Sequence, residues 1–288
     1  MELLIYLILF LLVLIVSSTT NKLLPFLPLP LVQILLGIVI GLFLPNTDFH
    51  LNTELFLALV IGPLLFRESE EADITAILKH WRIIVYLIFP VIFISTLSLG
   101  GLAHLLWLSL PLAACLAVGA ALGPTDLVAF ASLSERFSFP KRVSNILKGE
   151  GLLNDASGLV AFQVALAAWT TGAFSLGQAG SSLIFSILGG FLIGFLTAMT
   201  NRFLHSFLLS VRATDIASEL LLELSLPLVT FFLAEEVHVS GIIAVVVAGI
   251  LKASRFKKIT LLEAQVDTVT ETVWHTVNFM LNGSVFVI

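Results

Sequence analysis

The sequence predicts an all-α membrane protein: a polytopic bundle of about ten transmembrane helices, one of them broken near the midplane of the bilayer. Three observations lead to this prediction. Hydrophobic residues make up 58% of the 288-residue chain and charged residues only 11%, and the mean hydropathy is +1.09. Long apolar runs recur along the chain, and basic residues fall in every second connection between them. A soluble domain could not bury this much apolar surface.

The apolar runs define the predicted helices in order. A helix needs about 20 apolar residues to cross the hydrocarbon core, and fewer where it is broken or lined by protein. On this criterion the predicted spans lie near residues 2–20, 29–45, 51–66, 82–100, 103–133, 147–171, 181–201, 216–234, 238–251 and 272–288. The first run has Glu2 where a signal peptide has basic residues, so we expect a spanning helix. No short repeat or linker interrupts the runs, which predicts one transmembrane domain over residues 1–288.

The basic residues predict the orientation of the bundle. All 14 Lys and Arg residues fall in or beside connections near residues 21–28, 67–81, 134–146, 202–215 and 252–271, and the alternate connections have none. Cytoplasmic loops carry the excess of Lys and Arg, so we expect a multi-pass protein of the plasma membrane with its N-terminus outside. Within the second basic connection, residues 68–79 are either a short interfacial helix or a charged loop. Amphipathic rings prefer the headgroup region, and every tryptophan lies near a predicted span end: Trp81, Trp107, Trp169 and Trp274.

Composition excludes several partners and chemistries. The formal net charge is −5 and the basic residues are not clustered, so we expect no nucleic acid partner. Cys115 is the single cysteine, which excludes an intrachain disulfide and a multi-cysteine zinc site. The six histidines fall in connections or near span ends, without a His-x-x-x-His pair. We therefore expect no cofactor, and the lipid bilayer is the expected partner.

The fifth predicted span contains a Gly-Pro step, at Gly123 and Pro124, followed directly by Thr125 and Asp126. Proline lacks a backbone N–H and disfavours helix in the residue before it, so the helix should break here. Freed backbone groups are tolerated inside a membrane only where protein buries them or where they line a cavity. Broken helices near the midplane are typical of secondary transporters. A carboxylate at this depth is a functional candidate.

The sixth predicted span carries a second membrane-embedded carboxylate, Asp155. At 1.5 Å per residue, Asp155 lies roughly 10 Å beyond Lys148. Asp126 likewise lies roughly 15 Å before Arg136, so both aspartates fall near the middle of a core about 30 Å thick. Helical spacing places small and polar residues on the face of Asp155 and on the adjacent face: Gly151, Gly158, Glu150, Asn154 and Ser157. An all-oxygen site suits a hard cation, so we expect Na⁺ at Asp126 and Asp155.

Other interpretations of these acidic residues stay open. Asp126 and Asp155 could instead cap a helix or hold two spans together through salt bridges. Glu150 is expected to be structural, because it lies nearer the interface and could pair with an arginine of another helix. Glu219 and Glu223 lie near the cytoplasmic start of their span. For these two, a hydrated funnel or an interfacial edge is the simpler interpretation.

The motifs around the two aspartates resemble those of the monovalent cation:proton antiporters of the NhaP/NHE type. The resemblance rests on the step Thr125-Asp126 after the broken helix and on the run Glu150-Gly-Leu-Leu-Asn154-Asp155. The runs Gly62-Pro-Leu-Leu-Phe66 and Ala234 to Gly249 extend it over essentially the whole chain.

The resemblance implies that Asp155 is the essential ion- and proton-binding carboxylate, and that the protein is a homodimer. It places three further residues in the site: Thr125, Asp126 and Asn154. It implies a supporting role for Glu150 together with a distant arginine, and we add Gly151 and Ser157 to that supporting set.

The chain departs from the family pattern in three ways. Gly151 stands where many relatives have Ser, which removes one cation ligand. Arg67 stands where an acidic residue is frequent, which puts a ligand from the third span in doubt. The family also has further spans after the point where this chain ends, so we expect a C-terminally truncated chain that inserts but does not exchange ions alone.

These residues predict a secondary active transporter rather than an enzyme. Na⁺ and H⁺ would compete for the same carboxylates, and alternating access would follow from rocking of the helix bundle. Exchange is predicted to be electroneutral, because the sixth span offers Asn154-Asp155 rather than two adjacent aspartates. One alternative is a cation channel or uniporter without proton coupling. The other is an intramembrane aspartyl protease, although Asp155 follows Leu-Leu-Asn rather than Gly-x-Gly.

Overall fold

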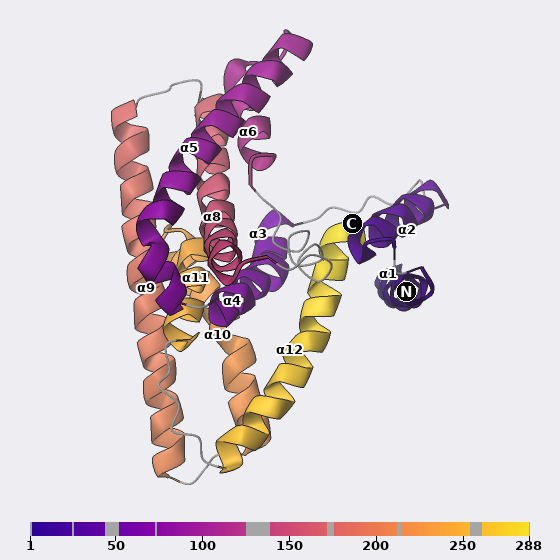
Figure 1. Cartoon of the computed structure of the whole chain (residues 1–288), viewed down its shortest axis with the longest axis vertical. Helices are drawn as coiled ribbons and strands as arrows, with labels where there is room; N and C mark the ends of the chain where they lie inside the picture. The colour runs from indigo at the N-terminus through magenta and orange to yellow at the C-terminus, as the bar shows by residue number, and fades with distance from the viewer. Residues whose placement is uncertain are drawn as a thin grey trace. The chain divides into compact units, whose positions relative to one another are not determined.

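The described part of the chain is helical (Figure 1). The computed structural model describes residues 2–24, 26–43, 52–72, 74–124, 139–171, 176–211, 215–253 and 261–287, and contains no strand within these ranges. The helices are α1 (Glu2–Leu23), α2 (Leu29–Phe43), α3 (Thr53–Phe56), the π-helix η1 (Leu57–Ile61), α4 (Gly62–Glu71), α5 (Ile74–Leu106), α6 (Leu112–Ala121), α8 (Lys141–Thr171), α9 (Leu176–Ser210), α10 (Ile216–Glu236), α11 (Gly241–Ala253) and α12 (Leu261–Val287). The predicted all-α fold class is confirmed, and each predicted span contains a described helix.

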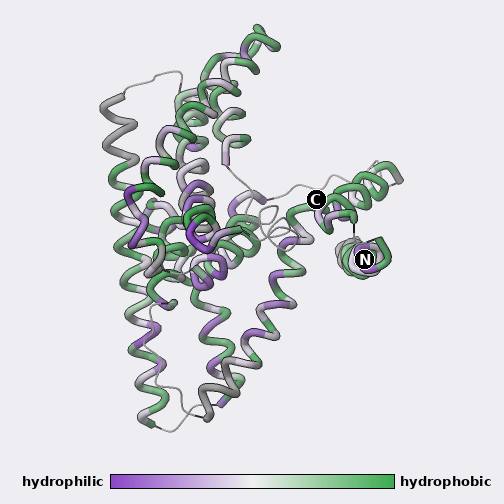
Figure 2. Tube along the Cα trace, viewed as in Figure 1, coloured by the Kyte–Doolittle hydropathy of each residue, from purple (hydrophilic) through white to green (hydrophobic). Residues whose placement is uncertain are grey.

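Apolar residues run along most of these helices (Figure 2). Three described segments are long and apolar enough to cross a membrane, Lys79–Leu106, Ile184–Ser210 and Ile216–Glu236. Shorter apolar helices of 10–17 residues account for other predicted spans, among them Leu29–Leu42 and Gly241–Ala253. This pattern is that of a transmembrane helix bundle.

Prolines and small polar residues explain where several helices begin. Pro30 lies in the first turn of α2, and Pro111 is the residue before α6; proline is tolerated there because a first-turn N–H needs no intrahelical partner. The side chain of Asn52 accepts a hydrogen bond from the N–H of Leu55, at 3.1 Å, and so caps α3. Between α3 and α4 the helix widens into the π-helix η1, a feature that hydrophobic periodicity did not predict.

The predicted boundary between the fourth and fifth spans is wrong. Gly100, taken as the end of the fourth span, and Gly101, in the predicted connection, lie inside α5, and the turn comes after Leu106. A Cβ atom at Gly100 would lie 2.9 Å from the Cα of Leu116, and a Cβ atom at Gly119 would overlap the carbonyl oxygen of Thr96. These glycines therefore let α5 and α6 approach closely, as small residues do between membrane helices, and they do not form a turn.

Other predicted helix boundaries also differ from those in the structure. The segment 68–79 is neither a separate interfacial helix nor a loop: α4 runs to Glu71, and α5 begins at Ile74. Helix α12 begins at Leu261, inside the connection predicted at 252–271. Trp274 is 1% exposed within α12. The prediction that it anchors a span end in the headgroup region is wrong, because its ring is buried against other residues of the protein.

By compactness the chain divides into two units. The first comprises Met1–Leu64, Phe203–Leu228 and Lys257–Ile288. In it, α12 packs against α1, α2 and η1. Glycine again allows close contact, because a Cβ atom at Gly283 would overlap Leu14 of α1.

The second unit comprises Leu65–Arg202 and Val229–Phe256. Helices α5, α6 and α8 pack against one another in it. Close backbone contact also joins α9 to α11, because a Cβ atom at Gly194 would overlap the carbonyl oxygen of Ala244. One transmembrane domain over the whole chain stays a prediction.

The turn between α10 and α11 supplies a first testable expectation. His238 has φ 57°, the left-handed conformation, and its N–H donates to the carbonyl of Glu235 at 2.9 Å. The N–H of Val239 donates to the carbonyl of Ala234 at 3.0 Å. This pair of bonds forms a Schellman motif, which prefers glycine at the left-handed position.

We expect His238→Gly to stabilise the protein by about 0.5–1 kcal/mol, because glycine has no Cβ to strain the left-handed backbone. His238→Val should lower stability, since a β-branched residue is a genuine outlier there. Thermal unfolding in detergent measures both. Equal midpoints for the two variants would show that the backbone conformation at residue 238 carries no strain.

Candidate functional site

Helix α6 ends just before the Gly-Pro step, as predicted. Its last helical residue is Ala121, and the N–H of Leu122 makes a closing hydrogen bond of 3.1 Å to the carbonyl of Val118. Helix ends leave carbonyl groups without intrahelical partners and carry a partial negative charge. Thr125 and Asp126 lie outside the described residues, and so their place in the site stays a prediction.

On α8, a hydrogen bond orders the residues before Asp155. The side-chain Nδ2 of Asn154 donates to Oε1 of Glu150 at 3.0 Å. Asn154 is 0% exposed and Glu150 is 6% exposed. The bond joins residues one helical turn apart, so Glu150 holds the amide of Asn154 in a fixed orientation. The supporting role of Glu150, expected together with a distant arginine, stays a prediction.

The end of α6 lies directly against α8. A Cβ atom at Gly158 would overlap Cγ of Pro124 and would lie 3.6 Å from the carbonyl oxygen of Ala120. Pro124 is two residues before Asp126, and Gly158 is three residues after Asp155. The structure therefore places the end of α6 against the helix that carries Asp155. Only glycine at residue 158 permits this approach.

The structure also brings Ser95, which the sequence analysis did not single out, next to the end of α6. A Cβ atom at Gly123 would lie 2.7 Å from the hydroxyl oxygen of Ser95 on α5. That hydroxyl donates to the carbonyl of Ile92 at 3.1 Å, and its lone pairs remain acceptors. The sequence signal was weak: a hydroxyl in an apolar span is usually satisfied by its own helix.

The predicted supporting residues Gly151 and Ser157 also lie on α8. Gly151 is buried and Ser157 is half-buried. Asp155 lies within α8, but its side chain is outside the described part of the chain, so Na⁺ binding at Asp126 and Asp155 stays a prediction. Among the described residues, no group of three His, Cys, Asp or Glu residues is arranged to hold a metal ion.

Comparison with known proteins decides the family. Residues 7–288 match the family model of the sodium/hydrogen exchanger, transmembrane. The chain belongs to the sodium/hydrogen exchanger family. The predicted resemblance to cation:proton antiporters is thus confirmed, and the chain is a multi-pass membrane protein.

Several relatives of this exchanger-family chain are named as antiporters or exchangers. It is 39% identical over 273 residues to a sodium, potassium, lithium and rubidium/H⁺ antiporter of Bacillus subtilis, covering 95% of this chain and 41% of that protein. It is 32% identical over 292 residues to YjcE of Escherichia coli, an uncharacterized Na⁺/H⁺ exchanger, covering 100% of this chain and 53% of that protein. The chain thus spans about half the length of these curated relatives.

A solved structure shares the fold. The sodium proton antiporter MjNhaP1 from Methanocaldococcus jannaschii superposes with a TM-score of 0.68 at 21% identity. The match covers 98% of this chain and 70% of that one.

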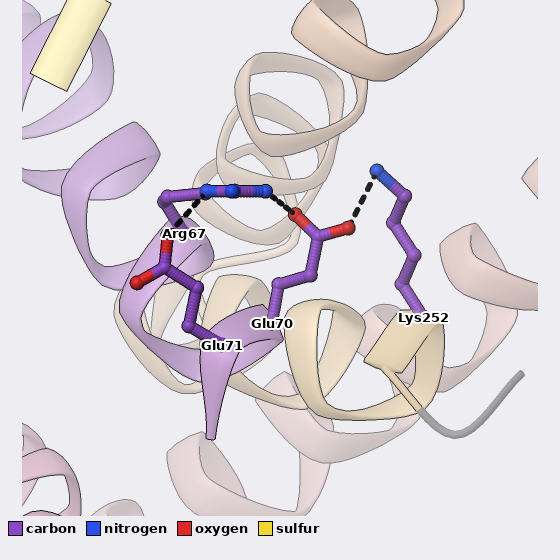
Figure 3. Close-up of polar contacts among 4 residues, drawn as sticks. All are labelled: Arg67, Glu70, Glu71 and Lys252. Carbon is purple, nitrogen blue, oxygen red and sulfur yellow. Dashed lines mark hydrogen bonds and ion pairs between the residues drawn. The ribbon is translucent and has the colours of Figure 1, made fainter. Parts of the chain in front are cut away.

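The departure of this exchanger-family chain at Arg67 has a structural explanation (Figure 3). Nη1 of Arg67 lies 3.1 Å from Oε2 of Glu70, and its Nε lies 2.7 Å from Oε1 of Glu71. Glu70 also reaches α11, where Nζ of Lys252 lies 2.9 Å from its Oε1. The guanidinium is therefore neutralised by its own helix. Arg67 thus has a structural role in an ion network. As a cation itself, it cannot replace an acidic cation ligand at this position.

Proposed function

We propose that the protein that contains this chain exchanges a monovalent cation, Na⁺ before K⁺ or Li⁺, for protons across the membrane. The observation that carries the proposal is the contact of Pro124 with Gly158, which places the broken helix beside the helix of Asp155. Membership of the sodium/hydrogen exchanger family supports it. No enzymatic step and no cofactor enter this proposal.

The site would work by competition for oxygen ligands. Asp126 and Asp155 would bind either H⁺ or the cation, with Thr125 and Asn154 as neutral ligands. The end of α6 adds carbonyl groups and the negative end of a half-helix, which favour a cation in broken-helix transporters. Glu150 would keep the Asn154 amide oriented.

Three finer features belong to the same proposal. Exchange would be one cation per proton, because Asn154 stands where a second acidic residue would add another titrating group. The protein would be a homodimer in the plasma membrane, and its N-terminus would lie outside. Gly151 and Ser157 would support the site by allowing close packing and by offering a hydroxyl.

Cation-induced alkalinisation of acid-loaded proteoliposomes tests the proposal. The protein that carries this chain is reconstituted with a pH-sensitive dye inside, and Na⁺, K⁺ or Li⁺ is added outside. We expect saturable alkalinisation, strongest with Na⁺. Cation uptake without proton movement would instead identify a channel or uniporter. Repeating the assay with the membrane potential clamped tests electroneutrality: a rate that depends on the potential contradicts one-for-one exchange.

Gly158→Ala tests the contact that carries the proposal. The added methyl group would overlap Pro124 and push the end of α6 away from α8. We expect the exchange rate to fall by roughly 10-fold to 100-fold, as small displacements of reacting groups do. Gly101→Ala is the matched control, because a Cβ atom there meets nothing within 4 Å. Equal exchange rates in the two variants would rule out a role for this contact.

A further inference from the structure

The beginning of α5 carries a pair of basic residues that the proposed exchange site does not use. Lys79 and Arg82 are three residues apart, so their side chains share one face of the helix. Both residues are exposed. Lys79 is also the first residue of Lys79–Leu106, a segment long and apolar enough to cross a membrane. The pair therefore lies where the helix passes from the headgroup region into the hydrocarbon core.

Acidic side chains do not neutralise this pair. In the described part of the chain, neither Lys79 nor Arg82 forms an ion pair. By contrast, glutamates of α4 neutralise Arg67 and Lys252. Charged side chains of membrane helices normally pair with one another or reach water and headgroups. The two cations of α5 can therefore bind an anion that comes from outside the chain.

A tryptophan beside the pair marks the depth of the headgroups. Trp81 is exposed, and Cζ of Arg82 lies 5.7 Å from the centroid of its ring, within the range of a cation–π contact. Tryptophan rings prefer the membrane interface. A guanidinium that lies over a ring still presents donors at its edge, and their geometry matches phosphate oxygens. The contact thus holds Arg82 at headgroup depth with donors for a phosphate.

Beyond the pair, the same face of α5 is aromatic and apolar. Tyr86 is 78% exposed and Phe93 is 66% exposed, and Leu97 follows one turn later. Steps of four and seven residues keep these side chains on the face of Arg82. At 1.5 Å per residue, Phe93 lies roughly 16 Å from Arg82 along the helix, about half of a core about 30 Å thick. The face thus offers cations at one end and apolar contact over the depth of one leaflet.

A second basic pair lies at the same end of α8. A Cβ atom at Gly149 would lie 2.8 Å from Cδ1 of Ile84 and 3.0 Å from Cγ1 of Ile77, so Gly149 is level with the basic pair of α5. Contacts with α6 further along both helices show that α5 and α8 run in the same direction. Lys141 and Arg142 are exposed and lie about two turns, roughly 10 Å, before Gly149. Basic residues within about 10 Å of an anionic membrane surface are attracted to it, so this pair adds charge without touching the lipid.

We propose that this face of α5 binds an anionic glycerophospholipid, with the phosphate at Lys79 and Arg82 and an acyl chain along Tyr86 and Phe93. The positive-inside pattern predicts that this end of the helix faces the cytoplasm, so the lipid comes from the cytoplasmic leaflet. A lipid fits the face better than a free phosphate does, because only a lipid has both an anionic group and an apolar chain. The inference does not depend on the proposed exchange.

Quenching of Trp81 by lipids with brominated acyl chains tests the site. The protein that carries this chain is reconstituted in phosphatidylcholine bilayers that contain a fraction of either brominated phosphatidylglycerol or brominated phosphatidylcholine. The difference in fluorescence between the wild type and Trp81→Phe isolates the signal of this residue. We expect stronger quenching by the anionic lipid, with saturation at a lower lipid fraction.

The basic pair is tested by charge removal. Lys79→Gln with Arg82→Gln should weaken the preference for the anionic lipid by about 25-fold, since each basic residue near the membrane surface contributes about fivefold. The swap of Lys79→Arg with Arg82→Lys keeps both charges and should keep the preference. Lys22→Gln with Arg202→Gln is the matched control, because it removes two exposed cations of α1 and α9 from the side that is also predicted to be cytoplasmic. This control should leave the preference at Trp81 unchanged.

Three results would overturn the lipid site. Equal quenching of the wild type by the two brominated lipids would show contact without recognition of the headgroup. Quenching by neither lipid would show that protein covers this face. Loss of the quenching when soluble inorganic phosphate is added would identify a site for a free anion instead. Each of these measurements reports lipid contact, so a protein without exchange activity would contradict the proposed function and not this site.

Discussion

Replacing Asp155 by asparagine should abolish cation-driven proton movement. The substitution keeps the size of the side chain but removes the charge that both H⁺ and the cation need in the proposed mechanism. The backbone at residue 155 lies in the middle of α8, and the neighbouring bond between Asn154 and Glu150 does not depend on the Asp155 charge. We therefore expect the variant to fold and to lose exchange by at least 100-fold, the scale on which misplaced or missing reacting groups act.

The measurement is dye-monitored alkalinisation of proteoliposomes at several Na⁺ concentrations. Glu236→Gln is the matched control, since it makes the same acid-to-amide change at an exposed residue at the end of α10. Asp126→Asn should weaken cation affinity and leave a residual signal. Na⁺-driven proton movement at the wild-type rate in Asp155→Asn would contradict the proposed mechanism.

Replacing Glu70 by glutamine should cause the largest loss of stability among single changes at the ion network. Glu70 lies between two cations, Arg67 on α4 and Lys252 on α11 (Figure 3). The Lys252 side chain is only 7% exposed. Removing the carboxylate takes away an ion-pair partner of this ammonium, and breaking a largely buried pair in this way costs about 3 kcal/mol.

The matched control for that loss is Glu71→Gln. Glu71 pairs with the same arginine, but its side chain is 59% exposed, and exposed pairs contribute about 0–1 kcal/mol. Thermal unfolding in detergent compares the two variants. The double variant Glu70→Gln with Lys252→Met should recover much of the lost stability, because it removes both charges of the pair. Equal unfolding midpoints for Glu70→Gln and Glu71→Gln would contradict a network anchored by Glu70.

Close packing around this network explains why Glu70 can reach a second helix. A Cβ atom at Gly249 of α11 would lie 2.5 Å from the carbonyl oxygen of Phe66 and 2.8 Å from Cβ of Ser69. Nζ of Lys252 lies 5.5 Å from the centroid of the Phe66 ring, within the range of a cation–π contact. Helices α4 and α11 are thus held together by a glycine contact and by charge.

The sequence alone determined the class of the protein, the number and order of its predicted spans, and the position of the helix break. These features depend on local chemistry. Apolar length decides whether a segment can cross a membrane, and the Gly-Pro step at Gly123 and Pro124 disfavours helix just where α6 ends, at Ala121. The family motifs around Asp126 and Asp155 are equally local.

Only the tertiary structure decided what the small and polar residues contact. The sequence predicted a helix end at Gly100, but this glycine packs α5 against α6. Gly158 is where α8 contacts Pro124. The sequence predicted that Trp274 lies at the membrane interface, but its side chain is buried. His205 and Glu219 are 14 residues apart in sequence, and nothing in their local pattern predicted a contact of 3.2 Å. The physical reason is the same in each case: a side chain is satisfied by whichever helix packs against it, and periodicity along one helix does not reveal that neighbour.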